Sequence, residues 1–165
     1  MAAILEEPNT FKSTTQTFQP GKYLSFRLGV EMYGISVKNI REIIRMQQIT
    51  PVPHKPDYVR GIMNLRGKVI PVIDMRLKFA LGKETFDERT CIVVVMVQDN
   101  EQQESTAGLI VDAVDEVMRI REEDFESDPA VGNTRTTAQV IGLAKTKGNL
   151  ISLLDIDQVV VHESF

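Results

Sequence analysis

The chain has 165 residues, of which 42% are hydrophobic and 25% are charged, and its formal net charge at pH 7 is -4. This balance is typical of a globular protein with a mildly acidic surface, which argues against nucleic acid as the main partner. The single cysteine, Cys91, excludes a disulfide within the chain, and we expect it to be buried as a small hydrophobic residue. Because residues 1–10 lack secretory-signal features and no apolar run approaches a membrane span, we expect a cytoplasmic protein without direct membrane insertion.

The N-terminal part of the chain predicts a leader followed by two strands. Residues 1–20 are rich in Thr, Gln and Glu and have no usable periodicity, so we expect a flexible leader that ends at Pro20-Gly21. Apolar and polar residues then alternate over 24–28, which is the pattern of a half-buried strand. Gly29 begins a turn into a second strand over 32–37.

A helix and a hairpin are predicted next. Residues 38–46 carry isoleucines at the i, i+3 and i+4 positions, which predicts a short amphipathic helix. The segment 51–56 contains three prolines, so regular structure must stop there. After it, residues 59–65 and 68–73 flank Arg66-Gly67, a two-residue connection in which glycine can adopt positive φ. These residues predict a β-hairpin.

The second half begins with a buried strand and contains one long loop. Residues 92–97 are a continuous apolar and mostly β-branched run, as expected of a strand covered on both faces, and the polar stretch 98–106 then turns the chain. Residues 122–138 are predicted as a long polar loop, because Asp128-Pro129 and Gly132-Asn133 disfavour regular structure. Another hairpin and a short tail complete the chain.

The chain also repeats itself. Residues 34–45 recur in residues 108–119 at an offset of 74, and residues 61–74 recur in residues 142–155 at an offset of 81. Lys147-Gly148 replaces Arg66-Gly67 in the second hairpin. Each repeat therefore contains several short strands with glycine-marked turns, a pattern suited to a small closed barrel. We predict two such barrels that share a junction, where recesses for ligands form preferentially.

The residues that catalysis or metal binding would need are not found in a recognisable arrangement. The two histidines, His54 and His162, have no second histidine or cysteine at ligand spacing, so we expect no metal and no cofactor. No phosphate-binding loop, nucleophile elbow or kinase motif can be drawn. Asp74 and Asp155 are a repeated carboxylate pair, and we expect each to cap a helix or turn. An enzyme remains an alternative that turnover abolished by Asp74→Asn would support.

A nucleic-acid-binding barrel is the second alternative. Small barrels bind single strands through a basic groove with stacking aromatic residues, and Lys and Arg gather between Arg60 and Lys78. However, Trp is absent, and the dense aliphatic pattern of that segment indicates core. Steep salt-dependent binding to single strands would favour this alternative.

The hairpin segment 58–76, Tyr33-Gly34-Ile35 and residues 108–117 resemble the CheW-type coupling domains of bacterial chemotaxis in order and spacing. The resemblance covers residues 20–162. It implies a mainly β fold of two five-stranded SH3-like barrels around a shared hydrophobic junction, with short helices. It also implies a non-catalytic adaptor that couples transmembrane chemoreceptors to the histidine kinase CheA, helps to regulate its autophosphorylation, and is recruited to membrane-associated arrays.

By the same resemblance, two sets of residues are expected to bind partners. The receptor-binding set, which would receive the helical tip of a receptor in a groove between the barrels, is Val37, Ile40, Glu42, Gly61, Arg66, Val114 and Val117. The kinase-binding set, which would contact the regulatory domain of CheA, is Ile49, Thr50, Val52, Phe125 and Val131. As alternatives, the four aliphatic residues of the first set belong to the core, Gly61 serves close strand packing, and Arg66 is a solvated turn residue.

The resemblance also suggests how the chain is divided. We expect one CheW-like domain over residues 21–162 after the leader, with barrels at about 22–80 and 90–160 and with exchange of strands between them possible. A coupling domain detached from a larger chain is an alternative. The leader and the terminus at Phe165 favour a protein that stands alone.

Overall fold

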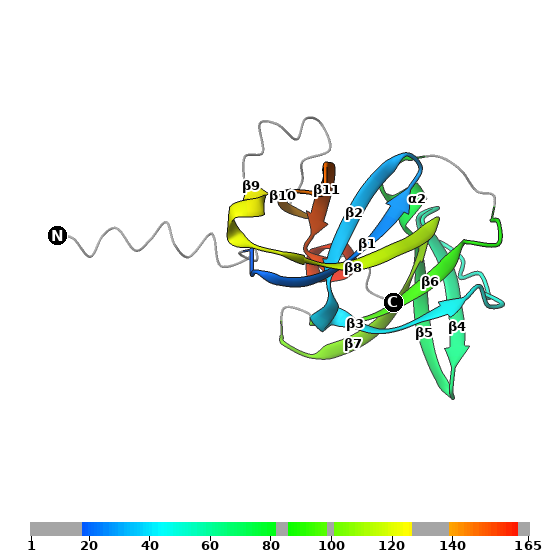
Figure 1. Cartoon of the computed structure of the whole chain (residues 1–165). Coiled ribbons are helices and arrows are strands. Elements are labelled where there is room, and N and C mark those ends of the chain that lie inside the picture. Colours follow the sequence, from blue (N-terminus) through cyan, green and yellow to red (C-terminus); the bar gives the residue numbers. More distant parts are fainter. Residues whose placement is uncertain (1–17, 82–85, 99–100, 127–138, 162–165) are drawn as a thin grey trace.

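A computed structural model describes residues 18–81, 86–98, 101–126 and 139–161 (Figure 1). The leader predicted over 1–20 therefore lies outside the described residues as far as residue 17, and the first strand begins at Gly21. Within these ranges, no helix is long and apolar enough to cross a membrane.

Two β-sheets make up most of the fold (Figure 1). The six-stranded sheet has the order β8 (Ala113–Ile120), β1 (Gly21–Leu28), β2 (Glu31–Ser36), β11 (Asn149–Leu154), β10 (Val140–Thr146) and β9 (Phe125–Glu126). The five-stranded sheet has the order β3 (Ile40–Arg45), β6 (Cys91–Gln98), β7 (Glu104–Val111), β5 (Lys68–Asp74) and β4 (Val59–Leu65). The short helices are η2 (Val37–Asn39), α2 (Met75–Lys78), η3 (Glu122–Asp124) and α4 (Ile156–Val161). The fold is mainly β, as predicted, with two hairpins at the expected places.

Each sheet curves into a small barrel. In the five-stranded barrel, Thr50 and Ile62 exchange two backbone hydrogen bonds of 2.8 and 2.9 Å, so the segment after β3 meets β4 and closes the seam. In the six-stranded barrel, β8 leads through η3 into β9, which pairs with β10. The extra sixth strand is the two-residue β9. Closure leaves few unpaired strand edges, which is the usual advantage of a barrel.

The sequence repeats do not coincide with the barrels. Residues 40–111 supply the whole five-stranded sheet, whereas the six-stranded sheet takes β1 and β2 from the first repeat and β8 to β11 from beyond Asp112. The approximate limits 22–80 and 90–160 therefore describe sequence repeats and not spatial units, because strands are exchanged between the two. The parallel pairs Val72↔Gly108 and Leu153↔Gly34 occupy equivalent positions in the two repeats.

Three apolar clusters hold this arrangement together, because burial of apolar side chains is the main favourable contribution to folding. One fills the six-stranded barrel and includes Met118 and Ile151. A second fills the five-stranded barrel and includes Met63 and Ile92. The largest cluster lies between the barrels and joins residues such as Phe26 of β1 with residues of β6, β7 and α4. This cluster is the predicted shared junction, and the half-buried Cys91 packs against it.

The helix predicted over 38–46 is wrong. Only the short 3₁₀ helix η2 lies there, and β3 follows it and pairs antiparallel with β6. The isoleucines fit a strand as well as a helix, because Ile40 and Ile44 turn inward while Ile43 lies on the solvent side. β-branched residues favour strands, and the edge of β6 supplies the partner that a local pattern cannot reveal. Its counterpart β8 in the second repeat is a strand too.

Two further predictions need correction. The loop predicted over 122–138 contains η3 and β9, because Phe125 packs into the six-stranded barrel and pairs with Ala144; residues 127–138 lie outside the described residues. The predicted tail contains helix α4, whose apolar residues pack into the shared junction. Asp155 precedes α4 and accepts a hydrogen bond from the backbone N–H of Gln158, so its predicted capping role is confirmed.

Candidate protein-binding site

Arg66 and Glu42 form a two-pronged ion pair at one end of the five-stranded barrel. Arg66 lies at the hairpin turn with φ +52°, and Gly67 follows at +88°, while the backbone N–H of Gly67 donates to Oδ1 of Asn64 at 2.9 Å. The turn directs both terminal nitrogens of Arg66 to the Glu42 carboxylate, at 2.5 and 2.6 Å. These hydrogen bonds hold the pKa of Glu42 below its usual range and raise that of Arg66. Two residues of the predicted receptor-binding set therefore act as one unit.

The six-stranded barrel carries the counterpart of this ion pair. Lys147 is the equivalent of Arg66, has φ +54°, and places its ammonium 3.6 Å from Glu116, which is the equivalent of Glu42. Both pairs join a hairpin turn to the strand that follows the crossing between the barrels, which is β3 for Glu42 and β8 for Glu116. A lysine makes a single contact where an arginine presents two parallel donors, so the Glu42–Arg66 pair is the more rigid of the two.

The aliphatic residues of the receptor-binding set gather where the chain crosses between the barrels. Val37 begins the crossing from β2 to β3, and Val114 follows the crossing from β7 to β8. Ile40 and Val114 are equivalent in the repeat, and both are half-buried against the shared junction. Val117 differs, because it lies on β8 with 53% of its surface exposed. Ile40 and Val114 therefore contribute to the core while keeping some accessible surface.

Gly61 is needed for the seam of the five-stranded barrel. Its φ is +142°, and a Cβ built there would lie 2.0 Å from the carbonyl oxygen of Thr50 and 2.9 Å from the Cα of Pro51. No other residue type fits, because the colliding atoms belong to the backbone. The residue itself is buried. This geometry supports the close-packing alternative for Gly61.

The kinase-binding set is divided between the two barrels. Ile49 packs against the interior of the five-stranded barrel, Thr50 forms the seam bridge, and Val52 is half-buried in the proline-rich segment. Phe125 lies on the six-stranded barrel and stacks on Phe18 with ring centroids 4.2 Å apart. The last member, residue 131, lies outside the described residues. The geometry does not bring the four described members into one patch.

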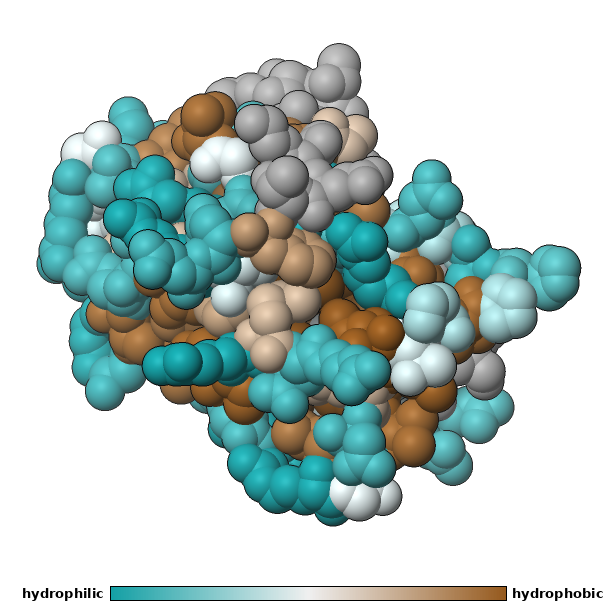
Figure 2. Space-filling view, turned by 90° about the vertical axis from the view of Figure 1, so that its right-hand side faces the viewer, coloured by the Kyte–Doolittle hydropathy of each residue, from teal (hydrophilic) through white to brown (hydrophobic). Residues whose placement is uncertain are grey.

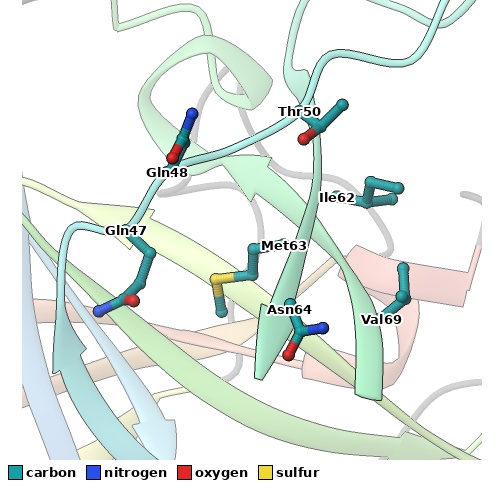
Figure 3. Close-up of a pocket in the computed structure, with 7 residues that line it drawn as sticks. All are labelled: Gln47, Gln48, Thr50, Ile62, Met63, Asn64 and Val69. Atoms are coloured by element: carbon teal, nitrogen blue, oxygen red, sulfur yellow. The ribbon is translucent and has the colours of Figure 1, made fainter. Parts of the chain in front are cut away.

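An open pocket of about 390 Å³ lies beside the seam of the five-stranded barrel (Figure 3). Its lining comes from the segment after β3 and from the β4–β5 hairpin: Gln47, Gln48, Thr50, Ile62, Met63, Asn64 and Val69. No charged side chain lines it. Figure 2 shows the side of the molecule where β4, β5 and α2 lie, and hydrophobic surface appears there in patches between hydrophilic side chains.

The repeat relates four exposed aliphatic residues in pairs, and sequence reasoning missed three of them. Ile43 and Val117 are equivalent and are 45% and 53% exposed, and Val69 and Leu150 are equivalent and are 64% and 53% exposed. Only Val117 was predicted to contact a partner. The offsets of the repeat were available in the sequence, but solvent exposure of a strand face depends on which strands pair.

The repeated carboxylate Asp74 is structural. It accepts a hydrogen bond from the backbone N–H of Arg76 at 3.0 Å, which caps α2 as predicted, and its buried carboxylate also pairs with the side chains of Arg76 and Arg60. No group of three His, Cys, Asp or Glu residues in the described ranges is placed to hold a metal ion. Four of the five basic residues from Arg60 to Lys78 are engaged: Arg60 and Arg76 pair with Asp74, Arg66 pairs with Glu42, and Lys78 lies over the ring of Tyr58. They do not form the free basic groove that single-strand binding would need.

The outer surface of this double barrel carries ion pairs at hairpin turns and separate aliphatic patches. Such a surface is typical of a protein-interaction module. Comparison with known proteins agrees. The model of the CheW-like domain family matches residues 22–164. The chain therefore belongs to the CheW-like domain family.

Relatives of known function support this assignment along most of the chain. The chemotaxis protein CheW of Klebsiella aerogenes is 32% identical over 142 residues, which cover 86% of this chain and 82% of the relative. That of Helicobacter pylori is 33% identical over 138 residues, which cover 84% and 80%. The crystal structure of the scaffolding protein TtCheW from Thermoanaerobacter tengcongensis matches with a TM-score of 0.76 and 38% identity, over 86% of this chain and 92% of that chain. This chain is a non-catalytic scaffold of chemotaxis and not an enzyme.

Proposed function

We propose that this scaffold couples transmembrane chemoreceptors to the histidine kinase CheA and thereby helps to regulate the autophosphorylation of the kinase. It does so in the cytoplasm, recruited to membrane-associated receptor arrays. The observation that carries the proposal is the Glu42–Arg66 unit, which stands on the strand that leaves the inter-barrel crossing at Ile40.

The receptor tip is proposed to bind at this crossing. A receptor tip is a helical bundle with an apolar stripe, and the accessible parts of Val37, Ile40 and Val114 offer aliphatic surface for such a stripe. The charged Glu42–Arg66 unit then fixes the register of the helix at the rim, because charged groups at the edge of an interface contribute more to specificity than to affinity. Val117 extends the aliphatic surface on β8.

The kinase regulatory domain is proposed to bind at a separate surface. Ile49, Thr50 and Val52 lie along the segment that closes the five-stranded barrel, next to the uncharged pocket. Phe125 lies on the other barrel. We therefore propose the barrel seam as the primary kinase contact and Phe125 as a separate, secondary one.

The proposal is tested by pull-down of a receptor signalling fragment and of a kinase regulatory domain. The full chain is compared with Arg66→Ala and with Lys147→Ala, which removes the equivalent basic residue of the other barrel. Val117→Asp is compared with Leu150→Asp, because both side chains are 53% exposed. Circular dichroism confirms that each variant is folded.

We expect wild type to bind both partners, and we expect Arg66→Ala and Val117→Asp to lose receptor binding while their controls keep it. Failure of the wild-type chain to bind either partner would show that the proposed coupling is wrong. Equal losses in Arg66→Ala and Lys147→Ala would remove the receptor site from the Glu42–Arg66 unit.

A further inference from the structure

A buried arginine ties the two barrels together. Arg76 is the second residue of α2 and is only 1% exposed. Its Nε and one terminal nitrogen donate to the two carboxylate oxygens of Asp74 at 3.0 and 2.9 Å. Its other terminal nitrogen donates to Oδ1 of Asp112 at 3.1 Å. One guanidinium therefore joins two carboxylates that lie 38 positions apart in the chain, at residues 74 and 112.

Asp112 lies at the point where the chain leaves the five-stranded barrel for the six-stranded one, between β7 and β8. Its second carboxylate oxygen accepts a hydrogen bond of 2.6 Å from the backbone N–H of Gly29, in the turn between β1 and β2. Its own backbone N–H donates to the carbonyl oxygen of Arg27 at 3.1 Å. A continuous series of hydrogen bonds therefore connects α2, which follows β5 of the five-stranded barrel, to the β1–β2 turn of the six-stranded barrel.

The second repeat does not keep this arginine-centred connection. The equivalent of Asp74 is Asp155, so the capping carboxylate is kept in the second repeat. The equivalent of Arg76 is Asp157, and the equivalent of Asp112 is Lys38, so the second repeat lacks the arginine and its second carboxylate. Asp157 instead accepts a hydrogen bond of 3.0 Å from the backbone N–H of Gln98 on β6, which is an exposed contact between α4 and the other barrel. Among the described residues, a buried guanidinium shared by two carboxylates therefore links the barrels on one side of this nearly symmetric molecule, and an exposed hydrogen bond links them on the other.

The cluster is balanced in charge, and it is buried at Arg76 and Asp74, while the Asp112 side chain remains 31% exposed. Arg60 adds a second guanidinium 3.2 Å from Asp74, and the ring of Phe86 lies 5.3 and 5.0 Å from the guanidinium carbons of Arg60 and Arg76. Two arginines thus accompany two aspartates. Taking a guanidinium out of water is unfavourable unless its hydrogen bonds are well oriented, so such a cluster tolerates little displacement. The apolar contacts of the shared junction, by contrast, hold the two barrels together without fixing their relative orientation, because the hydrophobic effect is not directional.

We propose that Arg76 and Asp112 are positioning residues that fix the orientation of one barrel relative to the other. Surfaces on the two barrels then meet a partner in a single arrangement. This inference goes beyond the proposed function and does not depend on which partner binds. The apolar junction supplies the stability of the contact between the barrels, and the buried cluster supplies its geometry.

The test measures distances between the barrels by double electron–electron resonance. Spin labels are attached at Val69→Cys and Leu150→Cys, two exposed and equivalent positions on different barrels, in a Cys91→Ala background. Asp112→Ala removes the link between Arg76 and Gly29. The matched control is Asp115→Ala, which removes an exposed pair with Arg27 on the neighbouring strand β1.

We expect a narrow distance distribution in the parent and in the Asp115→Ala control, and a distribution at least twice as broad in Asp112→Ala. A merely stabilising role would lower the melting temperature of folded Asp112→Ala and leave the width unchanged, and that result would overturn the proposal. Asp112→Asn, which keeps one acceptor but removes the charge, is measured in parallel. If the alanine variant does not fold, a broadened distance distribution in Asp112→Asn supports the proposal and an unchanged width overturns it.

Discussion

Replacing Gly61 with alanine should open the seam of the five-stranded barrel. The added Cβ would lie 2.0 Å from the carbonyl oxygen of Thr50 and 2.7 Å from its carbonyl carbon. Neither atom can move aside as a flexible side chain would, so the chain after β3 must shift. The two hydrogen bonds between Thr50 and Ile62 are then lost.

The expected cost follows from two contributions. A residue with a side chain at the observed φ of +142° is strained by about 1–3 kcal/mol. Loss of the two seam hydrogen bonds adds about 1 kcal/mol each. The sum is about 3–5 kcal/mol, a large part of the total stability of a typical domain. For a chain of this length, it corresponds to a melting temperature lowered by roughly 6–20 °C.

Thermal unfolding followed by circular dichroism measures the effect, with Gly67→Ala as the matched control. Gly67 also has positive φ, at +88°, but nothing lies within 4 Å of a Cβ built there. The control should lose only about 1 kcal/mol, or roughly 2–4 °C. Equal melting temperatures for the two variants would refute the close-packing explanation of Gly61.

Three further predictions concern single side chains. Because Arg66 lowers the pKa of Glu42, the ion pair is complete above the ordinary carboxyl pKa and is lost as pH falls through the lowered pKa of Glu42. Receptor binding should therefore stay constant from about pH 8 to 5 and weaken below about pH 4. A loss of binding at acid pH that persists in Glu42→Gln would contradict this assignment. Burial raises the pKa of Cys91, so its thiol should react with a disulfide reagent at least about tenfold more slowly in the folded protein than in denaturant. Equal reaction rates in the two states would show that the Cys91 thiol is not buried. Phe125→Ala removes the stack on Phe18 and should cost about 2 kcal/mol, lowering the melting temperature by roughly 4–8 °C, and an unchanged value in a thermal melt would show that the stack does not contribute.

Much of the fold could be predicted because its signals are local. The β4–β5 hairpin follows from Arg66-Gly67 between two apolar runs, and the buried strand β6 follows from the continuous aliphatic stretch after Cys91. The capping role of Asp74 follows from its place at the end of a strand. In each case, neighbouring residues contain the information.

The rest depends on contacts that are distant in sequence. The isoleucines of β3 fit the period of a helix as well as that of a strand, and only pairing with β6, about fifty residues later, decides between the two. The exchange of strands has no local signal, since two similar repeats offer similar edges. Arg76 meets Asp112 only after the chain has crossed between the barrels, so the sequence could suggest a cap at Asp74 but not the connection beyond it.

Reconstitution tests whether this chain couples receptors to the kinase. Receptor signalling complexes are assembled with CheA, with and without the chain, and kinase autophosphorylation is measured with and without attractant. We expect receptor control of the kinase only when the chain is present, with control lost in Arg66→Ala and kept in Lys147→Ala. Receptor control that is equally strong without the chain, or no control with it, would show that the chain does not couple the receptor to the kinase.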